Sequence, residues 1–515
     1  MNNFSILDCT LRDGGYYTSW DFDPCLVEQY LKVMNNLPVD YLEIGYRSPR
    51  LENQYLGKYF YLPVETIREI KTICEKKICI ILNEKDIKVT DIHDLLEPCR
   101  EYVTMVRLAV HPKNLKRAAS LIDPIKAMGF EICFNVMYMS TWLDDHTFLK
   151  NLEIVNHGLD YFYMVDSYGG VFPDQLKVIY NSVSSVLNAK IGFHGHNNME
   201  LALINSLTAI ECGVDIVDCT ITGMGRGAGN LKTELLLTTL NQKTNLEIDF
   251  NNLSQIVTSF KVLQSKFRWG TNLPYMVSGA YSLPQKQVME WVTKRFYSYN
   301  SIIQALQNQK ENREDNLRIN VFKEYKDFEN VLIIGGGVSP EHHKSAIKQF
   351  IKSQSNICII HASSKNAGFF KDVHVPQYFC LVGNEGYRLE EILQGLGGFQ
   401  GKCVLPPYPR KMGTYIPALV RDKSYELEKV SFTQLLNDSH TVLALQTSVE
   451  VRSKNVYLVG YDGYMGENIS QAERTLATEN EKLFEDFKKF TGQNLVALTP
   501  TNYQNLLEES VYGFI

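Results

Sequence analysis

In the first half of the chain, short apolar, β-branched runs alternate with longer stretches of helical periodicity, and this alternation limits the possible folds more than any other feature. The eight runs expected to be strands are residues 6–9, 41–44, 78–82, 104–110, 131–137, 161–165, 190–193 and 215–219. Gaps such as 65–76, 115–128 and 174–187 are long enough for helices. Eight such units in about 240 residues favour a (β/α)8 TIM barrel, although an open doubly wound sheet fits the alternation too.

A polar stretch separates this half from a second region of alternating strands and helices. Residues 246–320 carry aromatic residues at helical spacing and include QNQKENREDN (residues 307–316), which has almost nothing to bury. We therefore expect a barrel domain over 1–245, a helical extension and linker over 246–320, and a Rossmann-like α/β domain over 321–515. The strands expected in that last domain are residues 331–334, 357–361, 378–382, 441–445 and 456–459.

Composition and charge exclude several classes of protein. The net charge of −6 argues against a generally nucleic-acid-binding surface. No apolar run approaches the roughly 20 residues of a membrane span, and the first residues lack the pattern of a signal peptide. The 11 cysteines form no CxxC pair and are expected to be reduced. These features predict a cytoplasmic protein that binds neither nucleic acid nor membrane.

The first motif with chemical potential is LDCTLRDGG, residues 7–15, which is expected to begin on a strand and end in a turn. In a TIM barrel this places Arg12 and Asp13 at the carboxyl-terminal rim, where active sites lie. Taken alone, the pair is explained equally well as a structural ion pair.

The second motif is GFHGHNN, residues 192–198. Side chains two apart on a strand point to the same face, so His194 and His196 can converge on one ion together with a carboxylate. Such a mixed set of nitrogen and oxygen donors suits Mg, Mn, Zn or Fe and leaves positions for water or substrate. A lone histidine would more often be structural, but this HxH pair in a chain with 11 histidines favours a metal site.

The third motif is TGMGRGAGN, residues 222–230, which follows the last strand expected in the barrel. Its four glycines permit tight backbone turns near a ligand, and we expect Gly225 to border the substrate. A plain turn of the barrel would explain the glycines as well.

Taken together, the three motifs resemble those of the DRE-TIM metallolyase superfamily in order and approximate spacing. This group, with its HMG-CoA lyase-like or pyruvate carboxyltransferase domain, includes 4-hydroxy-2-oxovalerate aldolase, the closest in type, along with HMG-CoA lyase, isopropylmalate synthase and homocitrate synthase. The resemblance covers residues 1–245. It implies that Asp13, His194 and His196 hold a divalent metal, with Asn230 as a further ligand, and that Arg12 stabilises an enolate oxygen. The metal implied is Mn2+ or Mg2+, with Zn2+ as an alternative.

Three further residues match polar positions of that superfamily. Glu43 lies near the end of the second expected strand and is expected to take part in catalysis. Asp166 and Ser167 resemble a polar pair at another strand end and are expected to contact the substrate. A structural hydrogen-bonding role is an equally good interpretation for all three.

The sequence also departs from known members. The lyase branch carries a cysteine in the third motif, and residues 223–227 have none, so HMG-CoA lyase is rejected. The aldolases place a histidine base three residues after the metal aspartate, where this chain has Tyr16. Tyr16 is the candidate acid/base group, although a phenol with its ordinary pKa near 10 is a poor base at pH 7. The synthases have RDGEQ, and this chain has RDGGY.

These residues suit the cleavage or formation of a carbon–carbon bond next to a carbonyl. A Lewis-acidic ion and a fixed guanidinium can each stabilise the enolate that results. We expect a divalent-metal-dependent aldolase acting on a 2-oxo acid such as pyruvate and an aldehyde. The alternatives are an acyl-CoA-dependent Claisen synthase and a catalytically silent barrel scaffold. The segment WGTNLPY (residues 269–275) is expected to close the barrel or to join copies in a homo-oligomer.

The second α/β domain offers a weaker signal. The run VLIIGGG, residues 331–337, predicts a strand that leads through a glycine turn into a helix. Such a turn can present amide groups to a phosphate, so a nucleotide or sugar nucleotide is an expected partner. A tight turn without any ligand is at least as good an interpretation.

Overall fold

The computed structural model describes residues 4–52, 55–293, 299–312, 318–383, 385–393, 399–410, 415–464 and 471–515. The chain divides into two compact units, Met1–Val288 and Met289–Ile515, which are described separately below. The polar stretch expected to be a linker includes the end of a helix at Lys310, and residues 313–317 lie outside the described part.

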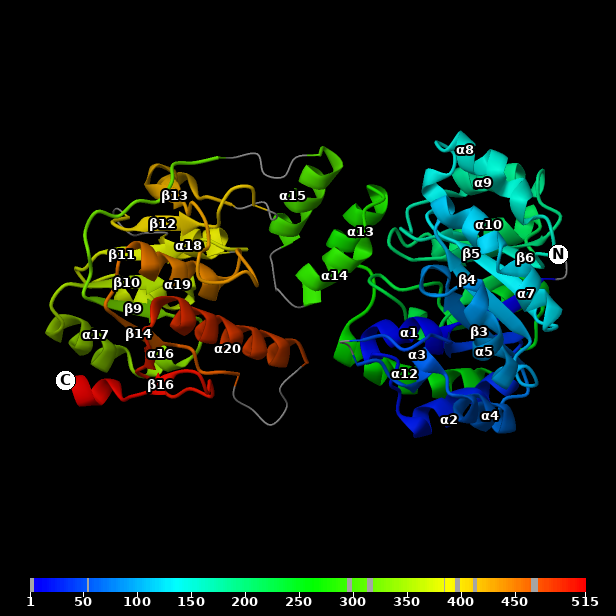
Figure 1. Cartoon of the computed structure of the whole chain (residues 1–515), viewed down its shortest axis with the longest axis horizontal. Coiled ribbons are helices and arrows are strands. Elements are labelled where there is room, and N and C mark those ends of the chain that lie inside the picture. The colour runs from blue at the N-terminus through cyan, green and yellow to red at the C-terminus, as the bar shows by residue number, and fades with distance from the viewer. Residues whose placement is uncertain are drawn as a thin grey trace. The chain divides into compact units, whose positions relative to one another are not determined.

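The first unit is a closed barrel of parallel strands that pair in chain order (Figure 1). The strands are β1 (Ser5–Asp8), β2 (Tyr41–Tyr46), β3 (Lys77–Asn83), β4 (Met105–Val110), β5 (Glu131–Val136), β6 (Tyr161–Asp166), β7 (Lys190–Gly195) and β8 (Ile216–Cys219). The barrel closes where β1 pairs with β8, with Asp8 opposite Cys219. The predicted TIM barrel and each of its predicted strands are confirmed, and the open sheet is excluded for this unit.

Helices cover the outside of the barrel. They are α1 (Thr10–Thr18), α2 (Pro24–Asn35), α3 (Lys58–Tyr61), α4 (Val64–Ile73), α5 (Ile92–Leu96), α6 (Leu115–Ala119), α7 (Ile122–Ala127), α8 (His146–Asn151), α9 (Pro173–Ser184), α10 (Ala202–Cys212) and α11 (Thr233–Thr244). The 115–128 gap, long enough for a helix, holds two short ones, α6 and α7. Pro124, inside α7, has no amide hydrogen to donate to residue 120 and its ring crowds that carbonyl, so the helix is interrupted before it.

The apolar core fills the space between the barrel and its helices, and it includes buried side chains such as Leu42, Ile80 and Phe134. A smaller apolar cluster contains Leu7, Met105 and Ile216. Polar side chains also point into this interior, and they belong to the site described below.

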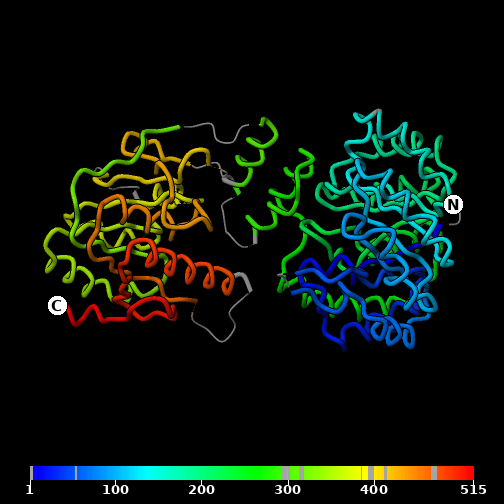
Figure 2. Tube along the Cα trace, viewed as in Figure 1, coloured from blue at the N-terminus to red at the C-terminus, as the bar shows by residue number. Residues whose placement is uncertain are grey.

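A run of helices follows the barrel, as predicted: α12 (Phe250–Phe267), α13 (Leu273–Ala280), α14 (Gln285–Thr293) and α15 (Tyr299–Lys310). The green α12 lies along the blue α2 in Figures 1 and 2. The ring of Phe260 lies 6.0 Å from that of Tyr30, and Ser259 donates a hydrogen bond to Gln29 at 2.9 Å. This helix therefore packs as part of the barrel unit.

The second unit contains a parallel sheet in the order β13-β12-β11-β10-β9-β14-β15-β16 (Figure 1). Its strands are β9 (Asn330–Ile334), β10 (Ile357–His361), β11 (Gln377–Cys380), β12 (Lys402–Leu405), β13 (Ser424–Glu426), β14 (Asn455–Val459), β15 (Leu495–Ala497) and β16 (Leu507–Glu508). Its helices are α16 (Ser339–His342), α17 (Lys344–Ser353), α18 (Glu385–Leu393), α19 (His440–Glu450) and α20 (Gln471–Thr491). The predicted second α/β domain is confirmed, and its strand order reverses between β9 and β14.

One strand predicted in this unit is wrong. Residues 441–445 lie inside α19, where Ser439 caps the helix by accepting a hydrogen bond from the Val442 amide at 3.2 Å. The helix is buried on nearly all sides, so its apolar run shows no helical periodicity. Strands β12, β13, β15 and β16, of two to four residues each, were not predicted.

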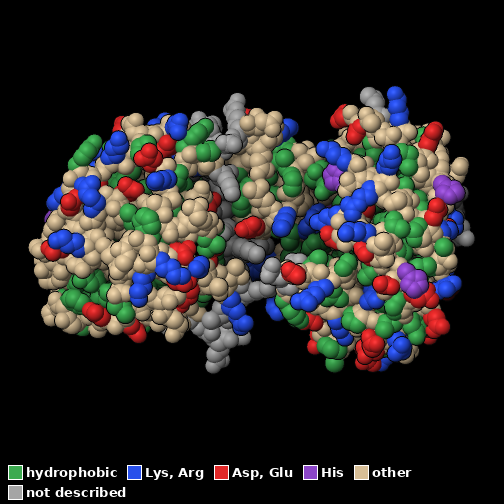
Figure 3. Space-filling model, in the orientation of Figure 1, with side chains coloured by type: hydrophobic (Ala, Val, Ile, Leu, Met, Phe, Trp, Pro, Cys, Tyr) green, Lys and Arg blue, Asp and Glu red, His purple; other side chains and the backbone are tan. Residues whose placement is uncertain are grey.

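The surface is mixed in charge. On the face drawn in Figure 3, acidic and basic side chains are interspersed with hydrophobic ones. None of the helices in the described part of the chain is long and apolar enough to cross a membrane.

Candidate metal centre and active site

The first motif continues from β1 directly into α1, and the turn predicted at its end is wrong. Its two glycines lie within the helix and allow close packing. A Cβ atom on Gly14 would lie 2.6 Å from the Met224 sulfur, and one on Gly15 would overlap the Trp20 ring. The first turn of α1 holds Arg12 and Asp13, both buried, at the carboxyl end of the barrel.

The two histidines of the second motif lie at the end of β7 and immediately after it. The imidazole rings of His194 and His196 are buried, with their centroids 5.1 Å apart. His196 also forms a β-bridge with Asn230 of the third motif. The Asn230 side-chain amide in turn donates a hydrogen bond to Asp13 at 2.6 Å. The three motifs, which are far apart in the sequence, thus meet at one end of the barrel.

Six residues inside this end of the barrel form a closed sequence of polar contacts, which we call the charge ring. In order around the ring they are Arg12, Asp13, His194, Asp218, Arg107 and Glu43. Positively and negatively charged side chains alternate around the ring, except that the imidazole of His194 lies between two carboxylates.

Most contacts of the ring are of hydrogen-bond length. Glu43 accepts a hydrogen bond from Arg12 Nε at 2.7 Å and lies 3.3 Å from Arg107 Nη1. Asp218 Oδ2 accepts from Arg107 Nη2 at 2.7 Å and lies 2.8 Å from His194 Nδ1. Arg12 also pairs with Asp13. Buried charges need partners of this kind to offset the loss of hydration, so the ring holds its members in fixed positions.

The electrostatics of the ring keep its groups ready to bind a cation. Burial alone would raise the pKa of Asp13, but Arg12 and the neighbouring histidines outweigh it, so the pKa lies below its usual value. Burial, reinforced by His194, lowers the pKa of His196 to about 3. At neutral pH this centre therefore presents a carboxylate and a neutral imidazole, the forms that ligate metals.

The donor set at this point fits a divalent ion. His194 Nδ1 is engaged with Asp218, so Nε2 faces the other side, where it lies 3.6 Å from Asp13 Oδ2. Two ligands of one ion, each about 2.0–2.2 Å from it, lie about 3–3.5 Å apart. The side-chain oxygen of Asn230 is buried without a hydrogen-bond partner in the described part of the chain, as expected of a ligand atom.

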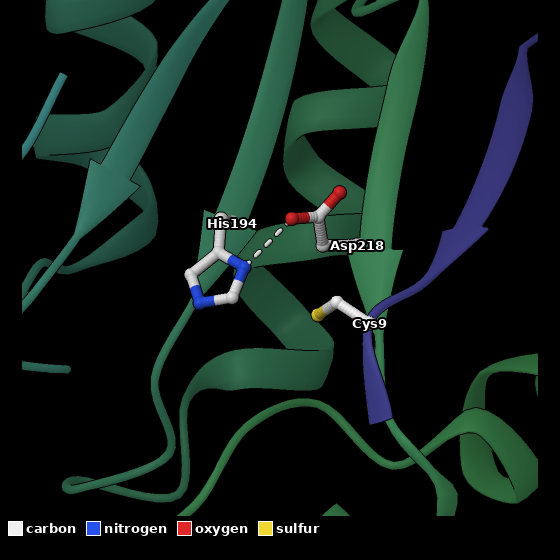
Figure 4. A group of neighbouring side chains, drawn as sticks. All are labelled: Cys9, His194 and Asp218. Atoms are coloured by element: carbon white, nitrogen blue, oxygen red, sulfur yellow. Dashed lines mark hydrogen bonds and ion pairs between the residues drawn. The ribbon is translucent and has the colours of Figure 1, made fainter. Parts of the chain in front are cut away.

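A second grouping of ligand atoms shares His194 and adjoins Asp13, since the Cys9 Sγ lies 3.7 Å from Asp13 Oδ2. Cys9, His194 and Asp218 each bring one such atom within 4.8 Å of the others (Figure 4). Asp218 Oδ2 is already shared between Arg107 and His194, and burial raises the pKa of the Cys9 thiol well above its usual value. A protonated thiol is a poor ligand, so protonation and charge, rather than distance, favour the Asp13 side.

Two other predicted residues border the centre. Tyr16 lies on α1 and is 40% exposed, with its hydroxyl 3.4 Å from that of Tyr46. Gly225 packs against Asn230, where a Cβ atom would lie 2.5 Å from the side-chain nitrogen. Gly225 therefore leaves room for the Asn230 amide.

Asp166 and Ser167, the pair predicted to contact substrate, bond to the backbone. Asp166, at the end of β6, accepts hydrogen bonds from the amides of Gly170 at 3.3 Å and Val171 at 3.1 Å. Burial raises its pKa to about 6 in spite of these bonds. Ser167 accepts from the Tyr138 amide at 2.9 Å. These contacts support the structural interpretation for both residues.

Sequence reasoning missed two members of the ring, Arg107 and Asp218. Arg107 is fully buried in β4, and its guanidinium also lies over the Tyr163 ring at 4.2 Å. A charged residue inside an otherwise apolar strand was the signal that could have identified it.

Comparisons with known proteins place this arrangement in a class. A family model described as HMGL-like matches residues 3–259. This stretch includes the TIM barrel with the arginine–aspartate pair and the HxH pair at its carboxyl rim. A solved N-terminal domain of a candidate aldolase from Bacteroides vulgatus is 52% identical, with a TM-score of 0.56, and the match covers 59% of this chain and all of that one. The chain belongs to the HMGL-like family.

Curated relatives are more distant. A 4-hydroxy-2-oxovalerate aldolase from Bacillus cereus is 26% identical over 255 residues, which are 49% of this chain and 74% of that protein. An oxaloacetate decarboxylase from Mycobacterium tuberculosis is 23% identical over 288 residues, which are 55% of this chain and 84% of that protein. These matches concern the barrel half of the chain.

Proposed function

We propose that the barrel is a divalent-metal-dependent carbon–carbon lyase, and more specifically an aldolase that acts next to the carbonyl of a 2-oxo acid such as pyruvate. The observation that carries this proposal is the convergence of Asp13, His194, His196 and Asn230 beside a fixed guanidinium. The relatives' names support it, since an aldolase of a 2-oxo acid and a decarboxylase of oxaloacetate both pass through the enolate of pyruvate.

In this proposal the residues have distinct roles. Asp13, His194, His196 and Asn230 would hold Mn2+ or Mg2+, with Zn2+ as an alternative. The bound ion would supply Lewis-acid stabilisation of the developing enolate charge. Arg12 would place its guanidinium against the same charge without reorganising, because Glu43 and Asp13 already fix it. Glu43 is thereby a positioning residue.

Proton transfer is assigned to Tyr16. Tyr16 is partly exposed, and its hydroxyl has that of Tyr46 as a hydrogen-bond partner. The buried Tyr46 can take part in a relay, since a hydroxyl both donates and accepts.

Metal analysis and isotope exchange test this proposal together. The wild-type protein is expected to bind one divalent ion per chain and to exchange the methyl protons of pyruvate in D2O. His194→Ala/His196→Ala should lose both properties. The matched control is His93→Ala/His157→Ala, because both of these histidines are highly exposed.

Each other outcome has a clear meaning. Unchanged metal content in the His194/His196 double variant would overturn the assigned ligands. Release of free thiol from acetyl-CoA would indicate a Claisen synthase instead. Wild-type protein that neither binds metal nor exchanges pyruvate protons would be a silent scaffold.

For the second unit we propose a nucleotide or sugar nucleotide as ligand, and this proposal rests on topology. In open parallel sheets, ligands bind outside the carboxyl ends of the strands where the strand order reverses, which here is between β9 and β14. The Gly335–Gly337 turn itself does not offer its amides to a phosphate, because the amides of Gly337 and Ser339 already donate to Gly460 and Asp462.

A panel of nucleotides and sugar nucleotides should raise the melting temperature of the full chain, and the absence of any shift would contradict the proposal. Assembly into a homo-oligomer stays a prediction.

A further inference from the structure

A third arginine, Arg226, lies beside the proposed metal centre in the loop after β8. Its guanidinium carbon is 5.6 Å from the centre of the Tyr16 ring. It is also close enough to His196, Tyr17 and Tyr168 to influence their ionisation electrostatically. Arg226 therefore belongs to the mouth of the site.

Arg226 differs from the two arginines of the charge ring in having no carboxylate partner among the described residues. Arg12 pairs with Asp13 and Glu43, and Arg107 with Glu43 and Asp218. No carboxylate of a described residue lies within 4.0 Å of the Arg226 guanidinium, and its Nε is buried without a described hydrogen-bond acceptor. A buried donor without a partner is unfavourable, and an anion paired with the guanidinium would offset that cost.

The loop around Arg226 is held in place from several sides. The Arg226 carbonyl accepts a hydrogen bond from the Gly229 amide at 3.2 Å. The next carbonyl, that of Gly227, accepts from the Tyr17 hydroxyl at 3.2 Å and from the Gly270 amide at 3.3 Å. The backbone that carries Arg226 is thus held in place, which reduces the entropy lost in ordering the loop when a ligand binds.

The charge balance of the site indicates what this ligand is. Within the charge ring, Arg12 and Arg107 are offset by Glu43 and Asp218. A divalent ion beside Asp13 leaves one positive charge, which the carboxylate of a 2-oxo acid neutralises. Arg226 then remains as a positive charge with no counterpart.

We propose that Arg226 binds an anionic group, a carboxylate or a phosphate, on the acceptor aldehyde, so that the enzyme joins a 2-oxo acid to an anionic aldehyde. This inference rests on the proposed aldolase function. In the reaction the methyl carbon of the 2-oxo acid loses a proton and bonds to the aldehyde carbon, whose oxygen gains a proton. No oxidant or reductant is needed. Cleavage is the reverse.

The same position of Arg226 disfavours decarboxylation of oxaloacetate as the main reaction. A guanidinium paired with the departing carboxylate stabilises the anion more than the neutral CO2 that leaves. Such pairing would bind the ground state more tightly than the transition state.

Matched aldehydes test the inference in the metal-loaded enzyme. Succinic semialdehyde is compared with butanal for a carboxylate, and glyceraldehyde 3-phosphate with glyceraldehyde for a phosphate. The wild-type enzyme should prefer the anionic member of one pair in kcat/KM by about 10- to 100-fold, the usual effect of a charge-assisted hydrogen bond. Which pair shows the preference identifies the anion.

Variants then assign the preference to Arg226. Arg226→Gln should reduce the ratio of anionic to neutral kcat/KM to about one, and Arg226→Lys should keep part of it, because lysine preserves charge without the planar fork. Arg68→Gln, on the exposed face of α4, is the matched control and should keep the wild-type ratio. An equal ratio in wild type and Arg226→Gln would overturn the inference.

A binding measurement separates this inference from the proposed function. 2-Oxoglutarate carries a distal carboxylate that 2-oxopentanoate lacks, and titration calorimetry compares the two on the metal-loaded protein. The wild type should bind 2-oxoglutarate more tightly, and Arg226→Gln should bind both equally.

If pyruvate exchange occurs but neither the aldehyde nor the 2-oxo acid pair shows a charge preference, the inference on Arg226 fails while the enolate chemistry stands. Failure of pyruvate exchange with the charge preference intact would instead reject the proposed function.

Discussion

Tyr16 is the residue to which we assign proton transfer in the proposed reaction. Its ring packs edge-on against Trp20 with centroids 5.0 Å apart, and its hydroxyl faces Tyr46. A structural tyrosine would need only the ring, whereas a proton-transferring one needs the hydroxyl.

We expect Tyr16→Phe to lower kcat by about 10²-fold or more, the usual contribution of general acid–base catalysis. Metal content should be unchanged, because Tyr16 contributes none of the proposed ligands. Tyr55→Phe is the control, since its hydroxyl bonds to Asp21 on the surface. A Tyr16→Phe enzyme with altered KM and wild-type kcat would show that Tyr16 only packs over the substrate.

At the scale of residues, the sequence predicted the side chains that occur in dense motifs and missed those that occur singly. Arg12, Asp13, His194 and His196 stand in motifs whose spacing is informative. Asp218 is a single carboxylate near the end of β8, and the pairing of β8 with β7 brings it to His194. A single carboxylate outside any motif gives no sign of such a contact across paired strands.

At the scale of elements, β7 and β8 are coupled through the contact between His194 and Asp218. A histidine that donates its other ring nitrogen to a carboxylate is held in one orientation, and loss of such a partner usually weakens metal binding about 10- to 100-fold. Asp218 also neutralises the fully buried Arg107.

Asp218→Asn should therefore weaken metal binding by about 10- to 100-fold. It should also destabilise the barrel by about 3–5 kcal/mol, because a buried arginine loses an ionised partner. Calorimetric titration with Mn2+ and denaturant unfolding measure the two effects. Asp215→Asn, just before the same strand, is the control: its carboxylate accepts from the Ile191 amide at 2.8 Å and lies outside the ring. Equal metal affinity in Asp218→Asn and wild type would rule out the positioning role.

The elements that the sequence predicted well are those with a strong periodic signal. Strands of the barrel are apolar, β-branched runs separated by stretches of helical periodicity, so both patterns are clear. The helix α1 was missed because two glycines predict a turn, whereas here they permit contact with Met224 and Trp20. Helix α19 was mistaken for a strand because burial on all sides removes its periodicity.

At the scale of the whole molecule, the response of the second unit to acid depends on a buried histidine. In the second unit, His361 at the end of β10 is fully buried and stacks on Phe379 with ring centroids 4.5 Å apart. Its Nε2 lies 2.8 Å from the side-chain oxygen of Gln377, and its Nδ1 has no hydrogen-bond partner in the described part of the chain. Burial lowers the pKa of His361 to about 4, although the bond to Gln377 opposes the shift.

This pKa predicts that acid destabilises the second unit through His361. An unfolded histidine takes up a proton near pH 6.5, whereas the folded one stays neutral down to about pH 4. Between these values the unfolded state binds more protons, so the free energy of unfolding falls as pH is lowered, by up to about 3 kcal/mol in total.

Hydrogen exchange of the β9 and β10 amides in the full chain measures this pH dependence of the free energy of unfolding. His361→Phe keeps the stacking and should flatten the dependence over this range, whereas His374→Phe, at an exposed position, should retain it. Parallel pH curves for wild type and His361→Phe would show that another group is responsible.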